Sequence, residues 1–284
     1  MTQADRPDNL PAHGVAHYEN FPVASFLCPP ALRPAIVAIY WFARTADDLA
    51  DEGDALAAKR LAELAAYRAD FLSCVANQPI SNRWASVFGR LQPVITQFAL
   101  PIDLLTDLLS AFEQDVTKTR YANQAELLDY CRRSANPVGR LLLHLYKVTD
   151  AGSLEQSDCI CSALQLINFW QDLSIDIPRG RIYLPADGFA QFGVGEAQLL
   201  QLEVNPATTA LIAANVAWAQ ALMLRGALLV KKVPGRAGWE LRLVVQGGLR
   251  IAEKIEQLNF ATLRQRPKLN AWDGAVMLWR ALLM

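Results

Sequence analysis

Residues 164–185, LQLINFWQDLSIDIPRGRIYLP, combine an apolar helical pattern with regularly spaced polar side chains. Asn168, Asp172 and Asp176 follow one another at four-residue steps, which places them on one face of a helix. Two carboxylates at positions i and i+4 repel each other, and burial among apolar neighbours strengthens that repulsion. A divalent cation between them would remove it, so the pattern indicates a metal site on an otherwise apolar helix.

The end of the same stretch adds positive charge. Pro178 disfavours continuation of the helix because it lacks an N–H and restricts the residue before it. Arg179, Arg181 and Tyr183 then bring two cations and a phenol close to the acidic pair. Carboxylates that hold a metal, next to arginines, suit a polyanionic substrate, and diphosphate is the first candidate.

A second acidic cluster lies in residues 40–54, YWFARTADDLADEGD. Asp47 and Asp51 form another i, i+4 pair, Asp48 is offset from them by about 100°, and Arg44 precedes them by one turn. Carboxylates at the C-terminal end of a helix oppose its macrodipole, so they too favour a cationic partner. Acidic helix ends are often only solvated, and that interpretation stays open for either cluster taken alone.

Two such clusters together favour magnesium, a hard ion that binds carboxylates and substrate phosphates. Two acidic helices that face each other across a cavity could hold two or three Mg²⁺ ions. These ions would neutralise a leaving diphosphate and let a carbon–oxygen bond ionise.

The whole chain reads as helical. No alternating strand pattern of useful length, no glycine-rich nucleotide motif and no internal repeat is present. We therefore predict one all-α domain over residues 21–284, after a loose lead-in at residues 1–20. The expected helices lie at about 35–50, 56–77, 82–98, 102–117, 124–133, 137–149, 155–176, 196–202, 206–230 and 239–260, and residues 270–284 form a final apolar segment.

Composition narrows the class of protein. Hydrophobic residues make up 52% of the chain and the net charge is −1, which argues against a nucleic-acid partner. Five scattered cysteines without a C-x-x-C pair predict neither disulfides nor a zinc site, and free thiols suit a reducing cytosol. We expect no signal peptide and no run of about 18 uncharged apolar residues that could span a membrane.

The C-terminal residues 269–284 are apolar and contain Trp272, Trp279 and Arg280. This segment could lie at the inner face of the membrane, in which case a cytoplasmic protein would be peripherally attached. Packing of such a segment on the helical body is the commoner arrangement, and both readings stay open.

The motifs resemble the squalene and phytoene synthase family of trans-isoprenyl diphosphate synthases, over roughly residues 18–265. The matching pieces are Tyr40-x-Phe42-Ala43-Arg44-x-x-Asp47-Asp48-x-x-Asp51, Tyr130-Cys131, Val138-Gly139, Gln165-Leu-x-Asn168-x-x-x-Asp172-x-x-x-Asp176 and Arg179-Gly-Arg181-x-Tyr183-x-Pro185. The resemblance implies an isoprenoid-synthase-type helical bundle around a central cavity.

The resemblance also implies site residues. The residues that it implies for metal binding are Asp47, Asp48, Asp51, Asn168, Asp172 and Asp176. Those for the substrate diphosphate are Arg44, Arg179, Arg181 and Tyr183. Those for catalysis are Asp47, Asp51, Asp172, Asp176 and Tyr183, and those for the hydrocarbon cavity are Phe21, Tyr40, Tyr130, Gln165 and Phe169.

Within the family, residues 19–25 (ENFPVAS), 134–139 (SANPVG) and 168–172 (NFWQD) resemble the bacterial hopanoid-pathway branch. This resemblance implies Mg²⁺-dependent conversion of presqualene diphosphate and water to hydroxysqualene and diphosphate. The steps would be ionisation, cation rearrangement and capture by water. NADPH is not expected, because water capture needs no hydride. Partner enzymes of squalene synthesis are expected.

Two alternatives remain open. The first is head-to-head condensation of two farnesyl diphosphates to presqualene diphosphate or squalene. The second belongs to a different class: a non-catalytic helical scaffold of the same fold, which loss of the acidic residues would mark. Both acidic clusters are complete in this chain.

Overall fold

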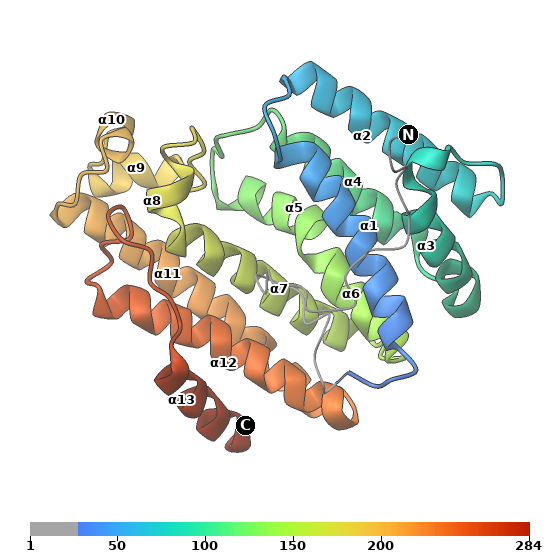
Figure 1. The fold of residues 1–284 in the computed structure, drawn as a ribbon. Coiled ribbons are helices and arrows are strands. Elements are labelled where there is room, and N and C mark those ends of the chain that lie inside the picture. The colour runs from blue at the N-terminus through green and yellow to red at the C-terminus, as the bar shows by residue number, and fades with distance from the viewer. Residues whose placement is uncertain (1–27) are drawn as a thin grey trace, which may run out of the picture.

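The computed structural model describes residues 28–284 and is built of helices (Figure 1). Within those residues the β-structure is limited to one isolated bridge, between Arg120 and Ile182. The expectations for the lead-in at residues 1–20, for Phe21 and for the 19–25 motif lie outside the described residues. The prediction of an all-α fold is confirmed.

The first group of helices surrounds one hydrophobic core, in which the ring of Phe42 packs against Tyr67 and Phe71 with centroids 5.6 and 4.9 Å away. All three rings are fully buried. The group comprises α1 (Arg33–Asp51), α2 (Ala57–Val75), the short 3₁₀ helix η1 (Asn82–Trp84), α3 (Ala85–Phe98) and α4 (Ile102–Asp115).

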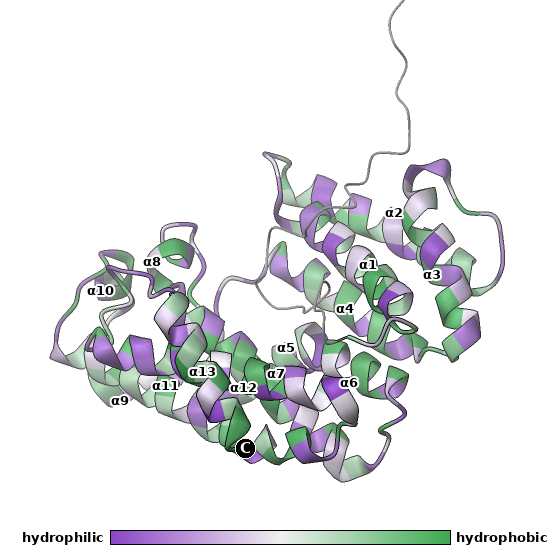
Figure 2. Ribbon diagram, turned by 60° about the horizontal axis from the view of Figure 1, so that its bottom comes forward, coloured by the Kyte–Doolittle hydropathy of each residue, from purple (hydrophilic) through white to green (hydrophobic). Residues whose placement is uncertain are grey.

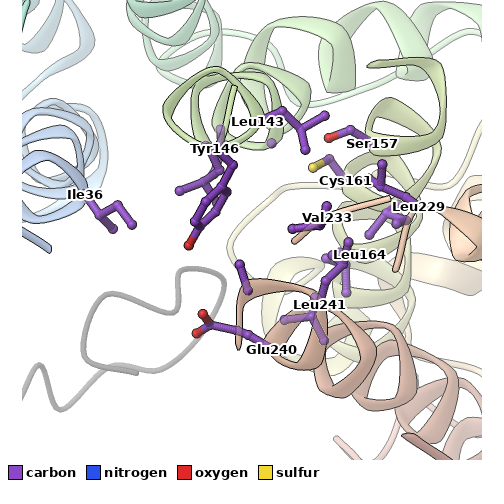
Figure 3. A pocket seen from close by; sticks show the side chains of 16 residues that line it. Ile36, Leu143, Tyr146, Ser157, Cys161, Leu164, Leu229, Val233, Glu240 and Leu241 are labelled. Atoms are coloured by element: carbon purple, nitrogen blue, oxygen red, sulfur yellow. The ribbon is translucent and has the colours of Figure 1, made fainter. Parts of the chain in front are cut away.

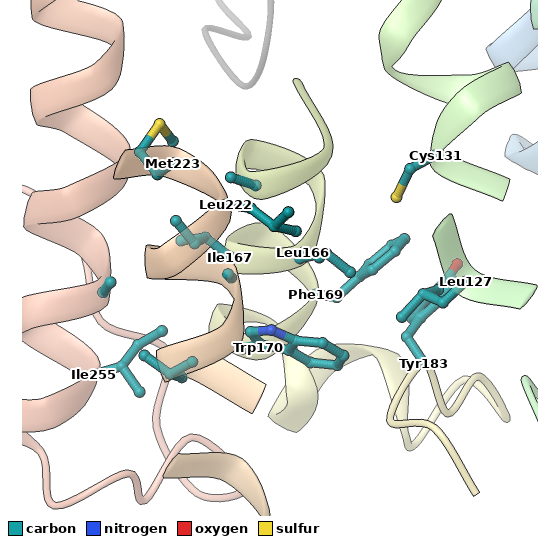
Figure 4. Packing of buried hydrophobic residues seen from close by; sticks show 14 of the residues in the cluster. Leu127, Cys131, Leu166, Ile167, Phe169, Trp170, Tyr183, Leu222, Met223 and Ile255 are labelled. Atoms are coloured by element: carbon teal, nitrogen blue, oxygen red, sulfur yellow. The ribbon is translucent and has the colours of Figure 1, made fainter. Parts of the chain in front are cut away.

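A second group surrounds another core (Figure 4), which includes Trp170 of α7, Met223 of α11 and Ile255 of α12. Its members are α5 (Gln124–Ser134), α6 (Asn136–Leu145), α7 (Ala151–Gln171), α8 (Leu173–Asp176), α9 (Asp187–Phe192), α10 (Glu196–Leu200), α11 (Pro206–Gly226), η2 (Ala227–Lys231), α12 (Gly235–Gln257) and α13 (Ala271–Leu282). Helix α6 contributes to both cores, through Leu141 to the first and Leu143 to the second.

Helices α7 and α11 lie side by side along much of their length (Figure 1). Gly226, at the end of α11, permits this closeness: a Cβ atom there would lie 2.5 Å from the Gln156 carbonyl oxygen and 2.6 Å from Ile160 Cγ1. By length and composition residues 206–231 could also span a membrane. The α11 side chains in the second core identify this helix as part of the protein interior.

The sequence pattern predicts one helix over residues 155–176, but the structure has two. Helix α7 ends at Gln171 and α8 begins at Leu173, with Asp172 between them at φ −100° and ψ 12°. The Ser174 N–H donates to the carbonyl of Thr262, 3.0 Å away, instead of to a helical acceptor. A tertiary hydrogen bond thus interrupts the helix at its central acidic residue. The short α9 was not predicted either.

Candidate active site

A cavity of about 400 Å³ lies between the two groups of helices, at the acidic ends of α1 and α7. Its lining residues are Asp47, Ala50, Asp51, Asp115, Tyr130, Gln165, Asn168, Phe169, Asp172, Ile175, Asp176, Arg179, Arg181, Tyr183 and Arg266. The two acidic sequence motifs, more than a hundred residues apart, therefore face one space. We call it the acidic pocket.

The α1 side of the acidic pocket carries Asp47 and Asp51. Helix α1 ends at Asp51, and Gly53 follows with φ +76°, a conformation that favours glycine. Burial raises the pKa of Asp47 to about 6, although the Arg44 guanidinium opposes the rise. A carboxylate so destabilised gains much from a cation.

Not every predicted residue of α1 lies in the pocket lining. Arg44 binds its own helix end instead: its guanidinium lies 3.3 Å from Asp47 Oδ2, 2.6 Å from Asp48 Oδ1 and 2.7 Å from Glu52 Oε1. Asp48 sits with Arg44 outside the lining, as does Tyr40. The offset of Asp48 from the i, i+4 pair accounts for its position.

The opposite side comes from α7 and α8. Asn168 Nδ2 donates to Asp172 Oδ2 at 3.1 Å, and the Asp176 N–H donates to the Asp172 carbonyl at 2.9 Å. Burial, and then the charge of Asp172, raise the pKa of Asp176 to about 6. The three residues stay together on one side of the pocket despite the break at Asp172, so the predicted grouping matches the geometry.

The loop after α8 closes the pocket and is held in place by its backbone. The Arg181 N–H donates to the Asp176 carbonyl at 3.0 Å, and the Ile182 N–H donates to the Thr119 carbonyl at 3.0 Å. Gly180, just before Arg181, has φ +83°, which a residue with a side chain rarely adopts. Arg179, Arg181 and Tyr183 consequently point into the same space as the carboxylates.

Aromatic rings line the acidic pocket next to Asn168 and Asp172. The rings of Phe169 and Tyr183 stack with centroids 3.7 Å apart and planes 7° apart, and Tyr130 lies 6.1 Å from Phe169. Burial, and then the nearby Asp115 carboxyl, raise the pKa of Tyr183 above its usual value, so its hydroxyl is a neutral donor at physiological pH.

Two charged lining residues were not predicted from the sequence. Asp115, at the end of α4, accepts a hydrogen bond from the Tyr130 hydroxyl at 2.9 Å, and burial raises its pKa to about 7. Arg266, in the loop before α13, pairs with Asp172, with Nε 2.5 Å from Oδ1 and Nη2 3.2 Å from Oδ2. Neither belongs to an acidic i, i+4 pair or to the arginine loop, so spacing alone gave no signal.

The donor set fits a hard divalent cation that also binds substrate. Five carboxylates and two amides line the pocket, and burial raises the pKa of three of those carboxyls. Among residues 28–284, however, no three His, Cys, Asp or Glu side chains converge closely enough to hold an ion by themselves. This suits Mg²⁺, which is commonly bound by one or two carboxylates and completed by phosphate oxygens and water.

A second, apolar cavity of about 110 Å³ begins one to two turns further back along α7 (Figure 3). Its α7 residues are Ser157, Ile160, Cys161 and Leu164, and Gln165 and Asn168 of the acidic pocket follow them in the same helix. Leu143, Leu229 and Leu241 line it from α6, η2 and α12. Its one charged side chain among the described lining residues is Glu240, with the phenol of Tyr146 near it.

A family model of squalene/phytoene synthase matches residues 15–273. The chain therefore belongs to the squalene/phytoene synthase family, whose prenyl diphosphate enzymes typically depend on metal ions. Membership agrees with the helical fold, the acidic pocket and an isoprenoid diphosphate substrate.

Among curated proteins, the hydroxysqualene synthase of Sinorhizobium fredii is 33% identical over 256 residues, 90% of this chain and 83% of that protein. The hydroxysqualene synthase of Zymomonas mobilis is 41% identical over 172 residues, 60% of this chain and 55% of that protein. Among solved structures, the squalene synthase HpnC of Alicyclobacillus acidocaldarius superimposes with a TM-score of 0.79 at 35% identity, over 86% of this chain and 90% of that one. A dehydrosqualene synthase at 21% identity shares the fold, with a TM-score of 0.76.

Proposed function

We propose that this protein converts presqualene diphosphate and water to hydroxysqualene and diphosphate, in squalene and hopanoid synthesis. The observation that carries the proposal is that two cavities of opposite character are lined by successive stretches of α7. One is lined by carboxylates and arginines and the other by hydrocarbon side chains. A substrate with a diphosphate head and an isoprenoid tail likewise has one charged part and one apolar part. The named activity of the relatives from Sinorhizobium and Zymomonas supports this choice.

Asp47 and Asp51 on one side, and Asn168, Asp172 and Asp176 on the other, would hold two or three Mg²⁺ ions together with the diphosphate. Bound there, the ions would supply Lewis-acid neutralisation of the leaving group. The side chains themselves would hold the head group between α1 and α7, and the hydrocarbon would extend toward the apolar cavity.

Arg179, Arg181 and Arg266 face this space and would donate charge-assisted hydrogen bonds to diphosphate oxygens. The neutral Tyr183 hydroxyl adds another donor. When the carbon–oxygen bond breaks, its electron pair leaves with the diphosphate oxygen, and these donors stabilise the added negative charge. The substrate carbon is left as a cation.

The cation would rearrange beside the stacked rings of Phe169 and Tyr183, whose faces stabilise positive charge without forming a bond. The apolar lining of the second cavity restricts water during this step. We place water capture near Glu240 and Tyr146, the polar groups at the end of that cavity. Water adds its oxygen to the cation and loses one proton, so no reductant and no NADPH is needed.

Residues 21–284 would act as one catalytic domain, because neither group of helices holds a complete set of the pocket's residues. The protein would work in the cytoplasm, peripherally at the inner face of the membrane. Its functional partner would be an enzyme that joins two allylic diphosphates to make the substrate.

Product identification tests the proposal. Purified protein with Mg²⁺ is incubated separately with presqualene diphosphate and with farnesyl diphosphate, each with and without NADPH, and the lipid extract is analysed by mass spectrometry. We expect hydroxysqualene from presqualene diphosphate, unchanged by NADPH, with ¹⁸O from labelled water in the hydroxyl. Presqualene diphosphate or squalene made from farnesyl diphosphate would instead support the condensing activity. If neither substrate is turned over, the result would support the alternative of a non-catalytic scaffold.

A further inference from the structure

The C-terminal helix α13 turns its charged side chains toward the protein. Asp273 is 1% exposed and forms ion pairs with Arg250 (Nε–Oδ1 2.7 Å) and Lys254 (Nζ–Oδ2 2.8 Å) of α12. Arg280, two turns later, pairs with Glu253 of the same helix. Both charged side chains of α13 therefore form ion pairs with α12, Asp273 in a buried position and Arg280 in a partly exposed one.

The outer side of α13 is apolar. Trp272 is 74% exposed, Trp279 64% and Leu283 72%, and Leu278 and Leu282 are each more than half exposed. Trp272, Trp279 and Leu283 follow one another at helical spacing. None of the exposed residues of α13 is polar or charged. Figure 2 shows the helix on the outside of α12, mostly in the hydrophobic colour.

The apolar surface continues beyond the end of α13. Helices α12 and α13 run antiparallel, since Asp273 contacts Lys254 whereas the Ala281 carbonyl accepts from Arg242. The guanidinium of Arg242 lies 4.7 Å from the centroid of the Trp239 ring, which is 40% exposed. We call the surface formed by Trp239, Trp272, Leu278, Trp279, Leu282 and Leu283 the tryptophan face.

Charge is distributed unevenly along the chain, and the segment that carries this face is basic. Residues 227–284 contain ten Lys and Arg but four Asp and Glu, whereas the rest of the chain contains seventeen and twenty-four. Lys268 is exposed just before α13, and Lys231 is exposed just before α12. The near-neutral protein therefore has a basic C-terminal region that carries its largest exposed aromatic side chains.

We propose that the tryptophan face docks on a membrane surface of anionic lipid. Exposed tryptophans and leucines flanked by lysine and arginine are the composition of helices that lie in the headgroup region of a bilayer. The excess of positive charge complements anionic headgroups, each basic side chain near the surface adding attraction. A second copy of this chain would bring two basic regions together, so charge favours the lipid. The docking extends the proposed function, because a hydrocarbon alcohol released here would partition into the bilayer.

Vesicle binding tests the docking. Full-length protein is mixed with vesicles of phosphatidylcholine alone or with added phosphatidylglycerol, and sedimentation and tryptophan emission are measured at low and high salt. We expect sedimentation with the anionic vesicles that weakens with salt, and a blue shift in emission. The double variant Trp272→Gln/Trp279→Gln should bind at least tenfold more weakly and lose most of the shift.

Two controls make the result decisive. Leu56→Gln/Leu200→Gln changes two exposed leucines, one just before α2 and one at the end of α10, and should bind as the parent does. Lys231→Glu/Lys268→Glu, which leaves the tryptophans intact, should weaken binding to anionic vesicles only. Equal binding by the parent and the tryptophan variant, or no binding by the parent, would overturn the proposal. So would a dimer, seen by sedimentation velocity, that the tryptophan variant abolishes.

Turnover of presqualene diphosphate in detergent micelles separates the two proposals. The tryptophan variant should keep the parent's turnover there. Vesicle binding by a protein without turnover would leave the docking in place and overturn the proposed function.

Discussion

Arg181 and Asp51, which are 130 residues apart in the chain, form an ion pair with Nη2 2.5 Å from Oδ1. The pair joins the loop after α8 to the last turn of α1, and so links the two acidic sides of the pocket. Nearly half of the Asp51 side chain is exposed, so the pair adds little to stability. The pair instead sets the position of Arg181. A metal ion bound by Asp51 would replace Arg181 as the partner of that carboxylate, and Arg181 could then bind the diphosphate.

Asp51→Asn should lower kcat/KM for presqualene diphosphate by about a hundredfold or more, because removal of a metal-binding carboxylate costs several kcal/mol of transition-state stabilisation. The thermal unfolding midpoint should stay close to that of the parent. Asp54→Asn, which changes an exposed carboxylate three residues later, is the matched control and should keep full activity. Unchanged turnover in Asp51→Asn would exclude the two-cluster model.

Arg266→Gln should weaken inhibition by inorganic diphosphate about tenfold or more, since a hydrogen bond to a charged group contributes about 1.5–3 kcal/mol. Arg264→Gln, at an exposed position two residues earlier, should leave inhibition unchanged. If both variants were inhibited alike, Arg266 would serve only to hold Asp172.

The metal-free protein should become less stable as pH rises from 5 to 8. Burial raises the pKa of Asp115 to about 7, and those of Asp47 and Asp176 to about 6. These carboxyls bind more protons folded than unfolded in this window, so stability falls as they ionise. Mg²⁺ with a diphosphate analogue should reduce this slope. Calorimetry across the pH range, with and without these additions, measures it, and a flat profile without metal would contradict the prediction.

Asp115→Asn should raise the free energy of unfolding by on the order of 2 kcal/mol more at pH 8 than at pH 5, because the neutral amide removes a cost of ionisation that grows over this range. Glu126→Gln is an informative contrast. Hydrogen bonds from Lys118 and from the Ala122 backbone lower the pKa of Glu126, so its variant should gain nothing at pH 8. Denaturant titrations at the two pH values compare them.

Gly226→Ala should destabilise the protein by about 1–3 kcal/mol, since the added Cβ would overlap the backbone of α7. Gly89→Ala, at an open position in α3, should be neutral or stabilise by up to about 1 kcal/mol through helix propensity. Urea unfolding of both variants decides whether contact with α7 causes the difference.

Local spacing predicted the helices and the pairing of Asp47 with Asp51 and of Asp172 with Asp176. Those relationships depend on helical geometry over a few residues. The break at Asp172 could not be predicted, because its cause is a hydrogen bond from Ser174 to a carbonyl far away in sequence.

The same distinction explains the remaining differences at the site. Asp115 and Arg266 enter the pocket from a helix end and a loop that carry no motif of their own. Arg44 follows the motif but binds its own helix end, because Asp48 and Glu52 lie within reach of its long side chain. The helical periodicity of the sequence does not predict which side chains from other elements will contact a given residue.

The residues around Asp172 are fastened to the segment before α13 at three points. Ser174 donates to the Thr262 carbonyl, Gln171 Nε2 donates to the Pro267 carbonyl at 2.8 Å, and Arg266 binds the Asp172 carboxylate. A protein shortened after residue 260 would therefore keep every recognisable motif and lose the braces that shape the second one. The shortest active fragment of this chain is therefore longer than the region that contains its motifs. A graft or a circular permutation must keep the contacts between residues 261–267 and the residues around Asp172.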